Sequence, residues 1–144
     1  MLRAVMMFFP AVLGAYVVGS IFATQTILGE LQAMAMPITL RDRLNASWHD
    51  LLGLTTSYLP LMFIAFLVAM PVAVGLSRYL PRARVVLYGL AGAVAILALH
   101  LIMKAVLGLN GIAAVREPEG LALQCLAGWF GGYLFYVFTG RAHR

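Results

Sequence analysis

One histidine and one lysine are the residues best suited to chemistry within an apolar stretch of this chain. His100 and Lys104 lie four residues apart in the run from Val85 to Leu107, VVLYGLAGAVAILALHLIMKAVL. A spacing of four places both side chains on one ridge of a helix. Basic groups within a membrane span are costly unless they meet protein partners or water. The pair therefore predicts either a binding site or a structural contact.

The composition places this ridge in an integral membrane protein. Of the 144 residues, 63% are hydrophobic and 10% are charged, whereas soluble domains have roughly 45–50% apolar and about 25% charged residues. The length suits one domain, residues 1–144, with four spans and short loops. The basic residues behind the net charge of +5 flank the apolar runs. They therefore indicate membrane topology rather than nucleic-acid binding.

Four apolar runs predict transmembrane helices at about residues 4–28, 51–76, 85–107 and 121–139. Between the first two, Thr39 followed by Asp42 resembles a helix capping box with Asp in place of Glu. A helix beginning there has one apolar face, formed by Leu40, Leu44, Trp48 and Leu51. We therefore predict an all-α bundle of four transmembrane helices, with a short amphipathic interfacial helix in the first outer loop.

Small residues recur at a spacing of four on the predicted spans. The first span carries Ala11, Ala15 and Gly19, and the fourth carries the GxxxG pair Gly128 and Gly132. The second span has a third ridge, Ala65, Ala69 and Ala73. Such ridges let helix backbones approach closely in a membrane. They favour a non-catalytic accessory or assembly subunit that packs against other transmembrane helices, in a homo-oligomer or in a larger membrane complex.

The charged residues define an expected orientation. Arg3, the three arginines of the second loop, Arg141 and Arg144 fall on one side, where there is no acidic residue, and all five acidic residues fall on the other side. The positive-inside rule then places both termini in the cytoplasm. In a bacterium the membrane is the inner membrane, and an organellar inner membrane fits the same pattern.

With this topology the polar residues of the spans collect in the outer half of the membrane. The expected ligand-binding set is His100, Lys104, Asp50, Ser20, Thr24, Gln25 and Gln124. Asp50 is the expected counter-ion of Lys104 or His100. A cationic pocket of this kind suits an anionic lipid, a quinone or a small anion, so a binding or transport protein is the alternative function. The same side chains can instead form structural hydrogen bonds between helices.

Several enzyme classes lack their residues in this sequence. The single cysteine, Cys125, excludes a disulfide within the chain and a CxxC redox site. No nucleotide-binding or HExxH pattern occurs, and a zinc site needs more ligands than one cluster offers. We therefore predict no catalytic residue, metal or cofactor. An enzyme that acts on a lipid, with His100 as general base, is a third hypothesis.

Overall fold

The protein is an all-helical bundle in the computed structural model, which describes residues 2–108 and 113–140. Four helices are long and apolar enough to cross a bilayer: α1 (Leu2–Ala33), α3 (Tyr58–Tyr79), α4 (Arg84–Leu107) and α5 (Pro118–Gly140). The shorter helix α2 (Leu40–Gly53) and two 3₁₀ turns, η1 (Pro81–Ala83) and η2 (Ala113–Val115), complete the described elements. The predicted fold class is confirmed.

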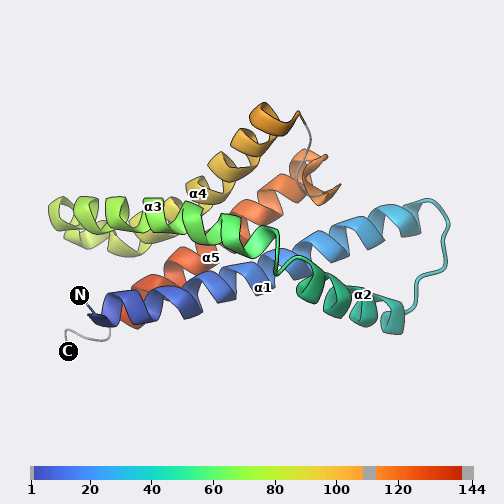
Figure 1. The fold of residues 1–144 in the computed structure, drawn as a ribbon, viewed down its shortest axis with the longest axis horizontal. Coiled ribbons are helices and arrows are strands. Elements are labelled where there is room, and N and C mark those ends of the chain that lie inside the picture. Colours follow the sequence, from blue (N-terminus) through green and yellow to red (C-terminus); the bar gives the residue numbers. More distant parts are fainter. Residues whose placement is uncertain (1, 109–112, 141–144) are drawn as a thin grey trace.

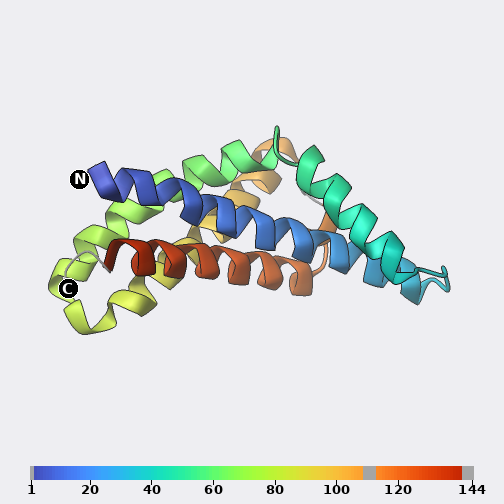
Figure 2. The ribbon, with the colours of Figure 1, turned by 90° about the horizontal axis from the view of Figure 1, so that it is seen from below.

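The start of α1, the turn η1 and the end of α5 lie together at one end of the bundle, called here the terminal end (Figure 1). At the opposite, loop end, α2 folds back along the far part of α1 (Figure 2). The 32 residues of α1 correspond to about 48 Å of helix, whereas the hydrocarbon core of a bilayer is about 30 Å thick. The excess length of α1 provides the surface on which α2 packs.

Glycines on α5 bring its backbone against α4. A Cβ added to Gly128 would lie 2.4 Å from the carbonyl oxygen of Gly92, and one added to Gly132 would lie 1.9 Å from that of Tyr88. No side chain fits at such distances. Close approach of this kind is the use that membrane helices make of small residues, and here both glycines contact a helix of the same chain.

The small residues of α1 are also covered within the bundle. Ala11 and Ala15 are fully buried, and a Cβ added to Gly131 of α5 would lie 2.5 Å from Cβ of Ala15. Gly19 lies against the side chain of Gln124. The ridges expected on the first and fourth spans thus face each other and α4, so neither is available to another protein.

The second span begins later than the sequence suggests. We expected it at residues 51–76, but α2 continues to Gly53 and α3 runs from Tyr58 to Tyr79. Hydroxyl side chains in the connecting segment bond nearby carbonyl groups: Thr55 Oγ1 donates to Leu51 at 2.7 Å. Such local bonds compete with a continuous helix. The other three helices extend the predicted spans by at most a few residues at each end.

Helix α2 begins with the predicted capping box. The Asp42 backbone N–H donates to Thr39 Oγ1 at 3.2 Å, and the Thr39 backbone N–H donates to Asp42 Oδ2 at 2.9 Å. The apolar stripe of α2 points away from the protein and consists of Leu40, Leu44, Trp48 and Leu52. The expected fourth member, Leu51, was wrong. It is half-buried against the core, and its carbonyl oxygen accepts from the Tyr16 hydroxyl of α1.

Candidate functional site

Polar side chains from all five α-helices meet in the loop-end half of the bundle. We call this set the polar layer, and it consists of Ser20, Thr24, Asp50, Tyr58, His100 and Gln124. All except Asp50 are at most 4% exposed. Polar groups buried at membrane depth need internal partners, because lipid offers none. The hydrogen bonds of the polar layer therefore show which of its side chains are satisfied within the protein and which could bind a ligand.

Gln124 links three helices within the polar layer. Its Nε2 donates to the Gly19 carbonyl oxygen of α1 at 2.8 Å, and its Oε1 accepts from the Tyr58 hydroxyl of α3 at 3.1 Å. The Gly19 carbonyl is accessible because glycine has no side chain to cover it. Gln124 is thus a helix-to-helix hydrogen-bonding residue of the kind found in membrane bundles.

His100 is held by its own helix and by one aromatic neighbour. Its Nδ1 lies 2.8 Å from the carbonyl oxygen of Ile96, and its ring centroid lies 5.7 Å from that of Tyr58. A carbonyl oxygen accepts, so Nδ1 carries the proton and a neutral imidazole leaves Nε2 as an acceptor. Within the described residues, His100 Nε2 and Ser20 Oγ are the buried side-chain polar atoms without a hydrogen-bond partner.

The structure pairs Asp50 with a threonine instead of a basic residue. Thr24 Oγ1 donates to Asp50 Oδ2 at 2.8 Å. This differs from the expected pairing with Lys104 or His100, because Asp50 belongs to α2, which packs along α1, rather than to the second span. Lys104 is exposed near the end of α4, where its side chain is placed to reach the membrane interface. Lys104 therefore lies apart from the other polar residues of the expected ligand-binding set.

Gln25 joins a second group of polar contacts, between α1 and the polar face of α2. Its Oε1 accepts from Arg43 Nη1 at 2.6 Å, and its Nε2 donates to Ser47 Oγ at 3.2 Å. Arg43 Nη2 also donates to Gln32 Oε1 at 2.6 Å. With Asp50, these side chains give α2 a polar face toward α1 and an apolar face outward. This arrangement suits a helix embedded at the membrane interface.

Sequence reasoning missed the two tyrosines that complete these contacts. Tyr16 and Tyr58 are each 2% exposed. The Tyr16 hydroxyl donates to the Leu51 carbonyl oxygen near the end of α2, and Tyr58 donates to Gln124. The sequence indicates only a general requirement, that the hydroxyl of a tyrosine buried in a span needs a hydrogen-bond partner. Which partner it finds depends on how the helices are arranged.

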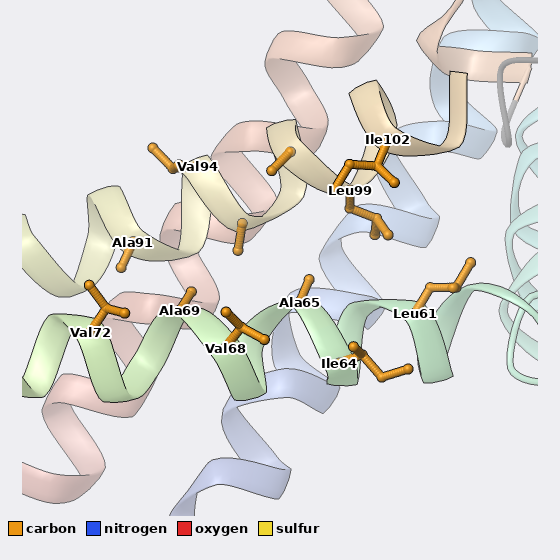
Figure 3. A pocket seen from close by; sticks show the side chains of 12 residues that line it. Leu61, Ile64, Ala65, Val68, Ala69, Val72, Ala91, Val94, Leu99 and Ile102 are labelled. Carbon is orange, nitrogen blue, oxygen red and sulfur yellow. The ribbon is translucent and has the colours of Figure 1, made fainter. Parts of the chain in front are cut away.

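A second candidate site is an apolar groove of about 560 Å³ on the outer surface between α3 and α4 (Figure 3). Its alanines are Ala65 and Ala69 on α3 and Ala91, Ala95 and Ala98 on α4. Larger apolar side chains flank them: Leu61, Ile64, Val68, Val72, Val94, Leu99 and Ile102. The small-residue ridge of the second span thus contributes to an open surface, in contrast to those of α1 and α5.

Comparison with protein-family models, with curated proteins and with solved structures finds no match for this chain. Among residues 2–108 and 113–140, no group of three or more His, Cys, Asp or Glu side chains is arranged to hold a metal ion. The candidate functional sites of this protein are therefore the polar layer and the α3–α4 groove.

Proposed function

We propose that this protein is a non-catalytic accessory subunit that binds one transmembrane helix of a partner protein in the α3–α4 groove. The observation that supports this is the alanine-lined groove on the outer surface of a membrane bundle. Alanines on both α3 and α4 let a third backbone come close, and close packing is a main source of helix association in lipid.

The shape of the groove favours a helix of another protein over a second copy of this chain. Two copies related by two-fold symmetry would place groove against groove, because such an interface uses the same patch on both partners. Facing grooves leave the alanines uncovered. A single apolar helix presents a convex ridge that fits between the larger side chains at the edges. The lining extends from Leu61 to Val72 on α3, or about 16 Å at 1.5 Å per residue.

The proposed setting is a bacterial inner membrane with both termini in the cytoplasm. The terminal end carries arginines, and the acidic residues lie at the loop end. This distribution supports the assignment through the positive-inside rule.

Two exposed valines on α4 provide a matched test. Val94 lines the groove and is 59% exposed, whereas Val86 is 53% exposed and does not line it. A photoreactive residue at position 94, in cells that produce the protein naturally, is expected to cross-link to a transmembrane segment of one other protein. The same residue at position 86 is expected to cross-link to lipid. Filling the groove with Ala69→Leu should abolish the protein cross-link from position 94.

Three results would contradict the proposed function. Lipid alone cross-linked from both positions would identify the groove as an ordinary lipid-facing surface. A protein cross-link that survives Ala69→Leu would place the partner elsewhere. A cross-link to a second copy of this chain would replace the partner protein with a homo-oligomer.

A second candidate function, binding of a small ligand at the polar layer, is favoured by one observation. His100 Nε2 and Ser20 Oγ are buried without partners among the described residues, and buried polar atoms normally have one. His100→Phe keeps a ring of similar size but removes Nε2. Loss of a copurified quinone or lipid in native mass spectrometry of this variant would support the candidate. An unchanged spectrum would leave the layer with a structural role.

A further inference from the structure

We infer that the terminal end binds an anionic phospholipid, with its phosphate in a pocket between α3, α4 and α5 and one acyl chain in an adjoining apolar cleft. The site shares no lining residue with the α3–α4 groove or with the polar layer, so the inference does not rest on the proposed function. The inference depends on the donor groups around the pocket, on the charge of this end of the protein and on the residue that the two cavities share, Val74.

The pocket has a volume of about 180 Å³, and four of the residues that line it carry donor groups without a protein acceptor in the described part of the chain. They are the guanidinium groups of Arg78 and Arg84 and the hydroxyls of Tyr88 and Tyr136. Within the described residues, none of these groups donates to a protein acceptor, whereas the other two hydroxyls of the lining, Ser77 and Thr139, donate to carbonyl oxygens of their own helices. Guanidinium groups bind phosphate through paired charge-assisted hydrogen bonds.

The electrostatic environment of this pocket is positive. All five acidic residues of the chain, Glu30, Asp42, Asp50, Glu117 and Glu119, lie toward the loop end. Helix α4 begins at Arg84, which lines the pocket, and has no side-chain cap, so the positive end of the helix dipole lies close to the pocket. No carboxylate side chain of the protein therefore competes with a phosphate for Arg78 and Arg84. Basic pockets between transmembrane helices are typical sites for anionic lipid headgroups.

An apolar cleft of about 250 Å³ adjoins the pocket, and Val74 lines both. The cleft lies between α1 and α3 and is walled by Phe8, Phe9, Phe63, Leu67 and Pro71 among others. Phe9 and Leu67 are more than half exposed, so the cleft opens to lipid. From Val74 to Phe63 it extends about 16 Å at 1.5 Å per residue, close to half of a hydrocarbon core of about 30 Å.

This arrangement identifies a phospholipid rather than free phosphate as the ligand. A phosphate alone would use the pocket and leave the cleft unused. A lipid places its headgroup at the membrane interface, where the arginines are, and its chain toward the membrane centre, where the cleft leads. The alternative is a purely structural role, in which Arg78 and Arg84 only anchor the loop at the membrane surface and set the topology of the protein. Arg82 distinguishes the two roles, because it lies in the turn η1 between Arg78 and Arg84 but does not line the pocket.

The test is native mass spectrometry of the detergent-purified full chain with added phosphatidylglycerol. Phosphatidylcholine is the headgroup control, and inorganic phosphate is the control without acyl chains. We expect one phosphatidylglycerol to bind about tenfold more tightly than phosphatidylcholine, and Arg78→Gln with Arg84→Gln to remove that preference. Arg82→Gln should retain it. Tyr136→Phe, which removes one donor and little volume, should weaken the binding several-fold without affecting folding.

A second pair of variants tests the acyl-chain cleft. Leu67→Trp fills the cleft and should weaken phosphatidylglycerol binding, whereas Leu76→Trp, at an exposed position of the same helix outside the cleft, should not. Equal weakening by Arg82→Gln and by the double variant would overturn the inference, because binding would then follow total charge. Inorganic phosphate that competes fully with the lipid, or a Leu67→Trp variant that binds normally, would overturn the lipid assignment.

Discussion

Gly92 on α4 and Gly128 on α5 approach so closely that neither position has room for a methyl group. A Cβ on Gly92 would lie 2.0 Å from the Gly128 carbonyl oxygen, and a Cβ on Gly128 would lie 2.4 Å from the Gly92 carbonyl oxygen. The obstacle on each side is backbone, which cannot turn away as a side chain can. The α4–α5 contact therefore depends on having glycine at both positions.

Gly128→Ala is expected to destabilise the bundle, because α4 and α5 must separate to admit the methyl group. We expect a loss of about 1–3 kcal/mol in the free energy of unfolding, the usual cost of overpacking. Gly75→Ala on α3 is the control, since a Cβ there meets nothing within 4 Å. It should be neutral or stabilising by up to about 1 kcal/mol, because alanine is the better helix former. Unfolding by SDS in mixed micelles measures both variants, and equal effects would contradict the close α4–α5 contact.

The hydrogen bonds of Gln124 should contribute measurably to stability. Gln124→Leu removes the bonds to Gly19 and Tyr58, whereas Tyr58→Phe removes only the second. Interhelical hydrogen bonds in membrane proteins average about 0.6 kcal/mol, so we expect the Gln124 variant to lose about twice as much as the Tyr58 variant. A double-mutant cycle measured in the same unfolding assay gives the coupling energy of the pair. No coupling would mean that the two side chains do not bond.

Arg43 should hold α2 against α1 more strongly than its neighbour Arg41. Arg43 donates to Gln25 and to Gln32, whereas Arg41 is exposed. Arg43→Ala should release α2, with a cost of about 1 kcal/mol after allowance for solvent screening. Amide hydrogen exchange measures this as faster exchange across residues 40–53. Arg41→Ala should leave the exchange unchanged, and similar effects of the two variants would show that the bonds of Arg43 do not hold α2 in place.

The start of α2 should lose order in acid. Hydrogen bonds from the Thr39 side chain and backbone lower the pKa of Asp42 below its ordinary value of 3.8. A carboxyl group whose pKa is lower in the folded state stabilises that state fully above its ordinary pKa, and this contribution is lost as the pH falls through the lowered value. Amide exchange at the first turn of α2 should therefore accelerate below about pH 4, beyond its intrinsic pH dependence. Asp42→Asn should remove this acceleration, and its persistence would assign the effect to another carboxyl group.

The sequence determined the five α-helices because the formation of each follows from local chemistry. Apolar runs of bilayer length can satisfy their backbone groups only as helices, and α4 in particular matches its predicted span almost to the residue. The capping box of Thr39 and Asp42 was also readable, since both partners lie within one helical turn.

Only the tertiary structure decided which polar and small residues meet. Asp50 was expected beside the start of the second span as the counter-ion of Lys104 or His100, but α2 continues to Gly53 and places Asp50 beside Thr24. The ridges of α1 and α5 face the interior, whereas Ala65 and Ala69 line an open groove. The spacing of residues gives the face of a helix on which they lie, but not the rotation of that helix relative to its neighbours. That rotation results from packing all the helices at once, which no single stretch of sequence specifies.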